Sequence, residues 1–213
     1  MNPEFRPFPK MPRLSRECII TEKIDGTNAS LFISEQEDLT PESKIIACFD
    51  GLSLWAGSRT RWITPSDDNF GFAAWAQENA HELIKLGPGT HFGEWWGQGI
   101  QRKYGLNEKR FSLFNVSRWA LHGTEPQQIP AADPRIIKMQ DVLPHCVGLV
   151  PTLYRGEFDT QRVNFELDAL HDFGSQAAPG FMNPEGLVVY HIAGNFGFKK
   201  TIHNDSEPKG KLI

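Results

Sequence analysis

Thr21-Glu22-Lys23-Ile24-Asp25-Gly26-Thr27-Asn28 is the first unusual stretch of the sequence, and it lies between two apolar runs. An Asp-Gly pair flanked by strand-like residues predicts a β-hairpin turn. That interpretation leaves Lys23, at the end of the first run, without a role, together with Thr27 and Asn28. A lysine held in a pocket can lose its proton through desolvation or a neighbouring cation, and it then acts as a nucleophile. Two interpretations therefore stay open, a simple hairpin and an active site around Lys23.

Outward from this stretch, short apolar runs alternate with Gly and Pro, and the chain has no internal repeat or low-complexity linker. Runs with β-branched or aromatic content predict strands, at 17–23, 29–34, 44–49, 90–95, 110–116 and 186–192. Helical spacing of apolar residues predicts one helix from Phe72 to a stop at Gly87 and another from Asp159-Thr160 to a stop at Gly174. Residues 130–134 and 176–184 are typical of loops. This order predicts one α+β domain.

The composition of the chain narrows its class. The 213 residues include 39% hydrophobic residues, with a formal charge of −4 and a mean hydropathy of −0.40, as in an ordinary globular protein. No stretch approaches the roughly 20 apolar residues of a membrane span, and the Pro-rich N-terminus lacks the apolar part of a signal peptide, so we expect a cytoplasmic protein. The three cysteines are too scattered for a disulfide framework or a zinc site. The acidic charge argues against a constitutive nucleic-acid coat, although not against a locally basic cleft.

A second unusual stretch, Thr90 to Gly99, places Glu94 inside a run of aromatic residues and glycines. Carboxylates rarely sit among such residues without a partner. A ribose hydroxyl or a bound Mg²⁺ would be a fitting partner, because both suit oxygen ligands. The alternative, which this stretch taken alone favours, is a strand end with Trp95 and Trp96 in the core and Glu94 in solvent.

A third pattern places Glu185 at the start of one apolar strand and Lys199-Lys200 at the end of the next run, Phe196 to Thr201. Salt-bridged strand ends are the default interpretation of such a pattern. It becomes functional if these residues converge with the first two stretches on one nucleotide. Neither G-x-x-x-x-G-K-[ST] nor G-x-G-x-x-G occurs in the chain, so a nucleotide would need another cradle.

Together these stretches resemble the covalent nucleotidyltransferases, and among them the RNA ligase 2 branch of the ATP-dependent polynucleotide ligases. Lys23 to Asn28 fits the form K-x-D/H-G-x-N of the family's first motif. The later motifs follow in order as Ser58-Arg59-Thr60, Phe92-Gly93-Glu94 with Gly99-Ile100-Gln101, Phe111 to Phe114, Glu185-Gly186 and Lys199. Two positions depart from the family pattern, because Tyr190 and Thr201 stand where members often carry a second lysine. Lys200 could compensate, but strand alternation would point it away from Lys199.

The resemblance implies one nucleotidyltransferase (ATP-grasp-like) domain over residues 1–213, with antiparallel sheets forming a nucleotide cleft flanked by helices and no separate C-terminal domain. It implies a monomer that uses ATP and Mg²⁺ or Mn²⁺ to seal RNA ends or nicks. Lys23 would attack the α-phosphorus of ATP to give lysyl-AMP. The enzyme would then pass AMP to a 5′-phosphate, and a 3′-hydroxyl would displace it.

The same resemblance assigns roles to individual residues. Lys199 and Arg59 would neutralise the transferring phosphoryl group with the metal, and Glu185 would hold that metal. The nucleotide contacts would come from Glu22 through its backbone, Ile24, Asn28, Glu94 on the ribose, Phe114 on the adenine, Glu185, Lys199 and Lys200. Nucleic acid would contact basic residues, among them Arg59, Arg61, Arg102, Lys103, Lys109 and Arg110. The alternatives are a DNA ligase, a capping-type guanylyltransferase, and a nucleotide- or RNA-binding module with weakened catalysis.

Overall fold

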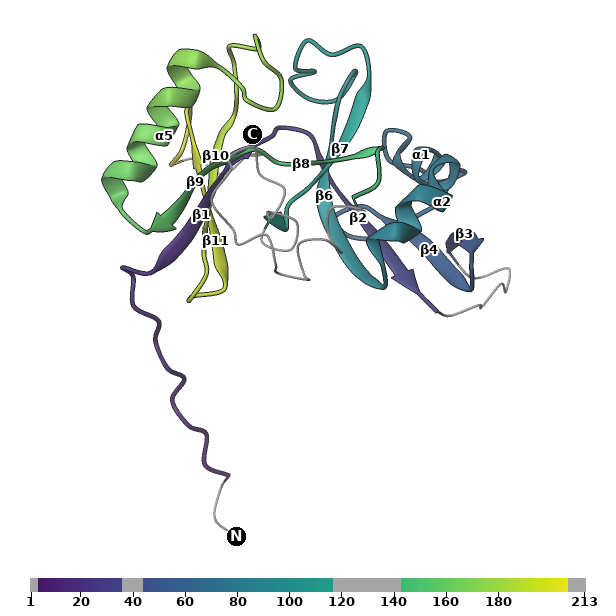
Figure 1. Cartoon of the computed structure of the whole chain (residues 1–213), viewed down its shortest axis with the longest axis horizontal. Helices are drawn as coiled ribbons and strands as arrows, with labels where there is room; N and C mark the ends of the chain where they lie inside the picture. Colours follow the sequence, from purple (N-terminus) through teal and green to yellow (C-terminus); the bar gives the residue numbers. More distant parts are fainter. Residues whose placement is uncertain (1–3, 36–43, 117–142, 207–213) are drawn as a thin grey trace, which may run out of the picture.

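A computed structural model describes residues 4–35, 44–116 and 143–206, which form two β-sheets joined side by side (Figure 1). The smaller sheet has four antiparallel strands in the order β11-β10-β1-β9. Their bounds are Glu17–Lys23 for β1, Thr152–Glu157 for β9, Gly186–His191 for β10 and Phe196–Thr201 for β11. Strand β1 therefore begins and ends where the sequence predicts, whereas β9 was not predicted.

The larger sheet has seven strands in the order β3-β4-β2-β6-β7-β8, with β5 paired to β4. Their bounds are Thr27–Ser34 (β2), Ile45–Phe49 (β3), Leu52–Gly57 (β4), Trp62–Ile63 (β5), Gly89–Gly97 (β6), Lys109–Leu113 (β7) and Val147–Leu149 (β8). The sequence did not predict β4, β5 and β8. All pairings in this sheet are antiparallel except β7 with β8, which run parallel.

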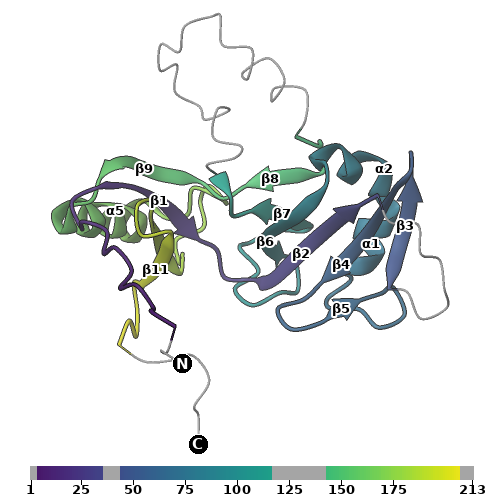
Figure 2. The same ribbon diagram turned by 90° about the horizontal axis from the view of Figure 1, so that it is seen from below.

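The hairpin predicted at Asp25-Gly26 is wrong. Strand β1 pairs with β9 and β10, whereas β2 pairs with β4 and β6, so the chain passes at Asp25-Gly26 from the smaller sheet into the larger one (Figure 2). Gly26 is needed there for close approach, because a Cβ on it would run into the backbone and side chains of β6. This passage puts the first motif at the junction of the two sheets.

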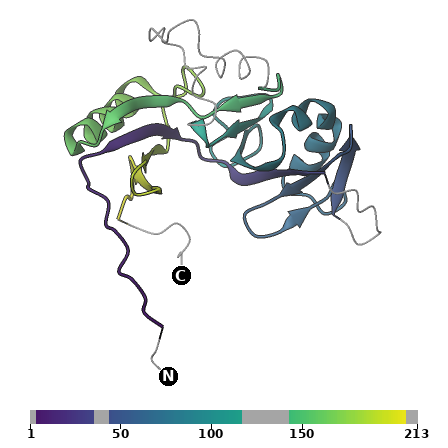
Figure 3. The same ribbon diagram turned by 60° about the horizontal axis from the view of Figure 1, so that its bottom comes forward.

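The helices cover the outer parts of the two sheets, at opposite ends of the molecule (Figure 3). The long helix α5 (Thr160–Phe173) packs on β10, starts at the predicted Asp159 and stops at Gly174. The Asp159 side chain accepts a hydrogen bond from the Gln161 N–H, as an N-cap residue does. The other predicted helix is broken into α1 (Phe72–Glu78), α2 (Ala80–Leu83) and a short 3₁₀ turn η1 (Ile84–Leu86).

Three apolar clusters hold these layers together. One lies between α1 and the larger sheet, and another between α5 and the smaller sheet. The third joins the two sheets and includes Ile19 from β1 and Trp96 from β6, with Ile24 between them in the crossing segment. The predicted α+β class with antiparallel sheets and flanking helices is therefore confirmed. The loop predicted at 176–184 is also present, while that at 130–134 lies outside the described residues. Among the described helices, none has the length and apolar character that a bilayer crossing requires.

Candidate active site

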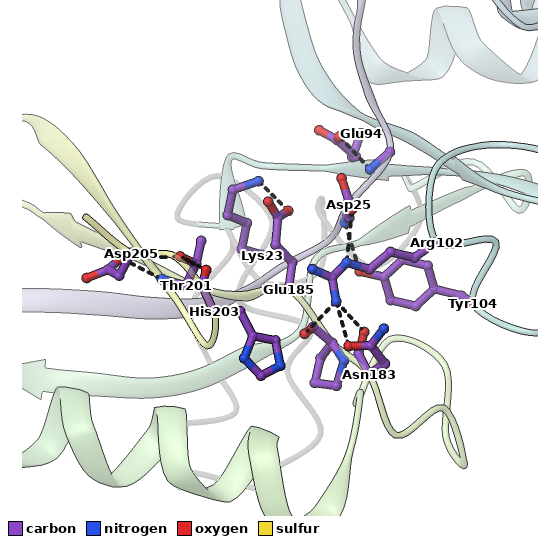
Figure 4. Close-up of polar contacts among 12 residues, drawn as sticks. Lys23, Asp25, Glu94, Arg102, Tyr104, Asn183, Glu185, Thr201, His203 and Asp205 are labelled. Carbon is purple, nitrogen blue, oxygen red and sulfur yellow. Dashed lines mark hydrogen bonds and ion pairs between the residues drawn. The ribbon is translucent and has the colours of Figure 1, made fainter. Parts of the chain in front are cut away.

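The centre of the site is an ion pair between the ends of two neighbouring strands. Lys23, the last residue of β1, is opposite Gly186 in β10, and Glu185 immediately precedes that glycine. The Lys23 Nζ donates to Glu185 Oε2 over 2.6 Å (Figure 4). The Lys23 side chain is 23% exposed, whereas that of Glu185 is 1% exposed. A buried carboxylate therefore fixes a lysine whose amine can still be reached from outside.

Glu94 contributes a second carboxylate from the other sheet. It lies opposite Asn28 in the β2–β6 pairing, so both side chains share one face of the larger sheet. Its Oε1 accepts the Gly26 N–H at 3.0 Å. Burial raises the pKa of Glu94 to about 7, against the opposing effects of Lys23 and of that hydrogen bond. The solvent-facing alternative for Glu94 is thus wrong, because its carboxyl group is desolvated at the sheet junction.

The residues on either side of Lys23 face away from it and anchor the strand. The Glu22 carboxylate is buried and accepts hydrogen bonds from Ser175 Oγ (2.5 Å), Gln176 N (2.8 Å) and Ala177 N (2.9 Å). Burial raises the pKa of Glu22, and these three bonds oppose that rise. The Ile24 side chain is buried in the cluster between the sheets. Because both side chains are engaged inside the protein, their backbone is the part that could meet a nucleotide.

The register of β11 separates the two neighbouring lysines. Lys199 lies opposite Val188, which lies opposite Thr21, so Lys199 shares the sheet face of Lys23. Lys200 lies opposite Leu187 and therefore points to the face that α5 covers. The predicted divergence of the two side chains is confirmed.

Thr201, one of the two departures from the family pattern, lies across Gly186 from Lys23. Its hydroxyl donates to the His203 carbonyl at 2.9 Å, and its N–H donates to Asp205 Oδ1 at 2.8 Å. Where family members often carry a second lysine, this chain thus has a short polar side chain that is hydrogen-bonded within the turn after β11.

Phe114 and Arg59 lie at the edges of the larger sheet. Phe114 follows β7, is 39% exposed, and donates its N–H to the Phe92 carbonyl, which extends the pairing with β6. Arg59 is exposed in the turn between β4 and β5. No described hydrogen bond joins the Arg59 side chain to Lys23 or Glu185.

Several of the predicted nucleic-acid contacts already have partners within the protein. Arg61 pairs with Asp67 on the surface, and Arg110 pairs with Glu108. Lys109 Nζ donates to the Phe70 carbonyl at 2.7 Å. Arg102 contacts Asp25 and the segment before Glu185, whereas Lys103 is exposed beside it.

Tyr104 and Asn183 lie at the junction although the sequence did not reveal them, and so does Asp25, which the first motif contains but to which no role was assigned. The Asp25 N–H donates to Tyr104 Oη at 2.8 Å, and the Arg102 guanidinium joins the Asp25 carboxylate to Asn183 (Figure 4). Burial raises the pKa of the Tyr104 hydroxyl, which therefore stays protonated. In the sequence Asp25 fits both turn chemistry and the first motif, whereas no local pattern marks Tyr104 or Asn183.

The donors at the junction suit a hard divalent ion that comes with phosphates. The charges of Glu185 and Asp25 both raise the pKa of Glu94, so three carboxyl groups interact electrostatically at the junction. Across residues 4–35, 44–116 and 143–206, no group of three or more His, Cys, Asp or Glu side chains could hold a metal by itself. Mg²⁺ usually takes one or two carboxylates and completes its shell with substrate phosphates and water. Glu185 fits that limited role.

Comparison with known proteins gives this geometry a family. The RNA ligase family model matches residues 16–202. Solved structures of the Naegleria gruberi RNA ligase share the fold: a Glu-to-Ala mutant with ATP and Mn has a TM-score of 0.56 at 18% identity, covering 89% of this chain and 51% of that one. A Lys-to-Ala mutant with ATP and Mn has a TM-score of 0.54 at 17% identity, covering 88% of this chain and 50% of that one. A Lys-to-Met mutant with AMP and Mn has a TM-score of 0.52 at 18% identity, covering the same shares of the two chains.

The chain spans about half the length of these structural neighbours. No curated protein sequence matches it significantly. At such identities the structural likeness shows the fold alone, but the family model extends over most of the chain, from before β1 to after β11. The resemblance seen in the ordered motifs is confirmed, and this chain belongs to the RNA ligase family.

Proposed function

We propose that the protein is an ATP-dependent RNA ligase that works through a lysyl-AMP intermediate on Lys23. The observation that carries this proposal is the Lys23–Glu185 pair, an accessible amine held by a buried carboxylate at the junction of two sheets. The family match supports it, as do the Naegleria gruberi ligase structures that contain ATP or AMP with Mn. The first motif thus supplies the nucleophile, and Glu185, Glu94 and Lys199 of the later motifs lie on its side of the junction.

In the first step the Nζ lone pair of Lys23 attacks the α-phosphorus of ATP. A P–N bond forms, the bond from the α-phosphorus to the bridging oxygen breaks, and pyrophosphate leaves with that electron pair. Lys23 must give up a proton before it attacks, and Glu185 Oε2 at 2.6 Å is the described acceptor nearest to it. Attack from a fixed lysine converts one difficult transfer into two easier ones.

The other residues hold the nucleotide and balance its charge. Glu94 and Asn28 lie side by side on the larger sheet. The Glu94 carboxylate accepts hydrogen bonds from the ribose hydroxyls, and the Asn28 amide group donates one to a phosphate or to the sugar. Phe114 stacks on the adenine, and the backbone at Glu22 and Ile24 contacts the base. Lys199, on the face of Lys23, and Arg59 neutralise the transferring phosphoryl group. Lys200 contacts a phosphate only if the end of β11 twists so that this side chain turns toward the face of Lys23.

Glu185 would hold the Mg²⁺ or Mn²⁺ that accompanies the nucleotide. When bound, such an ion would supply positive charge that offsets the charge of the phosphates. The described residues bind the nucleotide and orient the amine, and the ion would add charge.

In the later steps AMP passes from Lys23 to a 5′-phosphate end of RNA, and a 3′-hydroxyl then attacks that phosphate and expels AMP. Arg59, Arg61, Arg102 and Lys103 are the basic residues first assigned to the RNA. Arg59 and Lys103 are exposed and suit that role, because affinity for the RNA backbone depends on accessible cations. A monomeric domain over residues 1–213, acting in the cytoplasm, remains our expectation.

The proposal is tested by incubating the protein with α-³²P-ATP and a divalent ion. Label should stay on the denatured protein through an alkali-stable, acid-labile phosphoramidate bond, and Lys23→Ala should carry none. Label from GTP in place of ATP would indicate a capping-type enzyme. Nicked RNA, nicked DNA and single-stranded RNA, offered in parallel, identify the ends that are sealed. An unlabelled wild-type protein would contradict the proposal.

Thr201 favours a second candidate, a nucleotide-binding module with weakened catalysis. Where family members often carry a second lysine, this residue uses its hydroxyl inside its own turn. Such a module would bind ATP reversibly and show a dissociation constant by calorimetry without any covalent label. The same pair of measurements therefore separates the two candidates.

A further inference from the structure

Arg102 makes an unusual set of contacts for a residue in a surface loop. It lies in the connection between β6 and β7, residues 98–108. Its Nε donates to Asp25 Oδ2 at 2.9 Å. Its Nη1 donates to the Asn183 carbonyl at 2.9 Å, to Asn183 Oδ1 at 2.8 Å and to the Pro184 carbonyl at 3.2 Å (Figure 4). One planar guanidinium thus binds two separate chain segments at once.

Those two segments carry the two members of the central ion pair. Asp25 is two residues after Lys23, and Pro184 directly precedes Glu185. Arg102 lies in a loop between two strands of the larger sheet, whereas Lys23 ends β1 and Glu185 precedes β10 of the smaller one. The guanidinium therefore ties both sides of the Lys23–Glu185 pair to the opposite half of the molecule.

The loop around Arg102 adopts a costly backbone conformation to present this side chain. Gln101, Lys103 and Tyr104 have φ values of 43°, 60° and 51°, in the left-handed region that non-glycine residues rarely adopt. Such conformations persist only where the surrounding contacts over-determine them. Tyr104 supplies contacts of that kind, because its ring packs at 4.6 Å from Phe181 and its Oη accepts the Asp25 N–H.

We propose that Arg102 is a positioning residue that sets the alignment of Lys23 against Glu185, and hence the geometry of adenylation. This inference rests on the proposed function. Arg102 acts through Asp25 and the 183–184 segment and touches neither reacting atom. A lysine cannot replace it, because an ammonium group is a point charge that cannot reproduce the planar fork of donors. The side chain is 22% exposed, so the role that the sequence suggested, contact with RNA, does not account for its inward bonds.

The test compares Arg102→Lys and Arg102→Ala with wild type in single-turnover adenylation over a range of ATP concentrations. Arg102→Lys keeps a cation beside Asp25, so its melting temperature should stay near that of wild type. Its maximal adenylation rate should fall about 100-fold, because small misplacements of a reacting group cost that much. The half-saturating ATP concentration should change little. Adding guanidinium ion to Arg102→Ala should restore part of the rate.

Arg155 offers a matched control. Its Nε binds Glu17 Oε1 at 2.7 Å at the far end of β1, with both side chains about half exposed. Arg155→Lys and Arg155→Ala change an arginine–carboxylate pair of the surface without touching the junction, so both should adenylate at the wild-type rate. Amide hydrogen exchange at Asn183 and Glu185 should accelerate in both Arg102 variants and in neither Arg155 variant.

Wild-type adenylation by a folded Arg102→Lys would overturn the inference. So would normal adenylation with a selective loss of RNA sealing, which would make Arg102 an RNA contact. Should Arg102→Ala fail to fold, Arg102→Lys still decides between these results. Failure of the proposed function looks different, because the wild-type protein itself would then carry no label.

Discussion

The Nζ of Lys23 lies 2.6 Å from Oε2 of Glu185, and only the lysine has access to solvent. Replacing Glu185 by Gln keeps the shape of the side chain but removes the charge that holds the amine. Because breaking one half of a buried pair costs about 3–5 kcal/mol, we expect a lower melting temperature and no covalent AMP adduct. Labelling with α-³²P-ATP and thermal unfolding measure both effects. Glu17→Gln, at the exposed far end of the same strand, should leave both unchanged.

Glu94 should make the stability of the protein depend on pH. Its pKa is raised from 4.5 to about 7 by burial, so between these values the folded protein keeps a proton that the unfolded chain has released. Its stabilising contribution is therefore complete below pH 4.5 and is lost as the pH rises through about 7. Relative to Glu94→Gln, the free energy of unfolding of the wild type should fall by roughly 3 kcal/mol over this range. Urea unfolding of the two proteins across these pH values measures the difference, and a constant difference would contradict the prediction.

The same titration should appear in nucleotide binding. An ionised Glu94 accepts hydrogen bonds from both ribose hydroxyls, whereas the protonated acid has lost part of its accepting capacity. We expect the affinity for α,β-methylene-ATP, which cannot release pyrophosphate, to rise as the pH passes through about 7. Calorimetric titration at several pH values measures it. In Glu94→Gln this rise should be absent.

Gly26 should tolerate no side chain. A Cβ there would press on the Trp95 carbonyl, on Trp96 Cβ and on Glu94 Cγ, of which the first is backbone that cannot move aside. Gly26→Ala should therefore destabilise the fold by about 1–3 kcal/mol and displace Lys23, with a loss of adenylation. At Gly197 in β11 a Cβ would meet only Val188 Cγ1, at 3.8 Å. Gly197→Ala should leave stability and labelling near wild type in the same assays, and an equal loss in both variants would refute this explanation.

Lys199 and Lys200 should differ sharply despite being neighbours. The register of β11 places Lys199 on the face of Lys23 and Lys200 on the face of α5. Removing one preorganised donor that faces developing negative charge costs about 10²–10³ in rate, so Lys199→Ala should lose about 100-fold or more in single-turnover adenylation. Lys200→Ala should stay within about twofold, since its contact with Asp205, at 4.0 Å, is a weak surface pair. Equal losses would show that the strand end twists toward the cleft.

The two Asp-Gly pairs of the chain show how far local sequence predicts this fold. Asp50-Gly51 has positive φ at both residues and joins β3 to β4, as a two-residue hairpin turn requires. Asp25-Gly26, with the same letters between similar runs, instead crosses between sheets. The difference comes from the packing of Gly26 against β6, which is a long-range contact. Local patterns predicted the bounds of β1 and α5 closely, because those bounds depend on the periodicity and stop signals within each element rather than on distant contacts.

The ordered motifs named several residues that meet at the sheet junction, but not how they meet. They named Lys23, Glu94, Glu185 and Lys199, but the pairing of β1 with β10 is what joins Lys23 to a carboxylate 162 residues away. Asp25 stands in the first motif, but it received no role because turn chemistry already explained it. Arg102 was assigned to RNA because a basic loop residue has no sequence mark that distinguishes an internal contact from a surface charge. Such partners become visible only once the strand register is known.

The passage of the chain from β1 into β2 also has a mechanical consequence. Lys23 ends a strand of one sheet, while Asn28 and Glu94 lie on the other, and residues 24–26 join the two. The chain crosses a second time at Val150-Pro151, between β8 and β9. Any opening of one sheet relative to the other must therefore be absorbed by rotation about the backbone bonds of these two short crossings. Because one crossing is the first motif itself, its length limits how far the Lys23 amine and the Glu94 carboxyl group can separate.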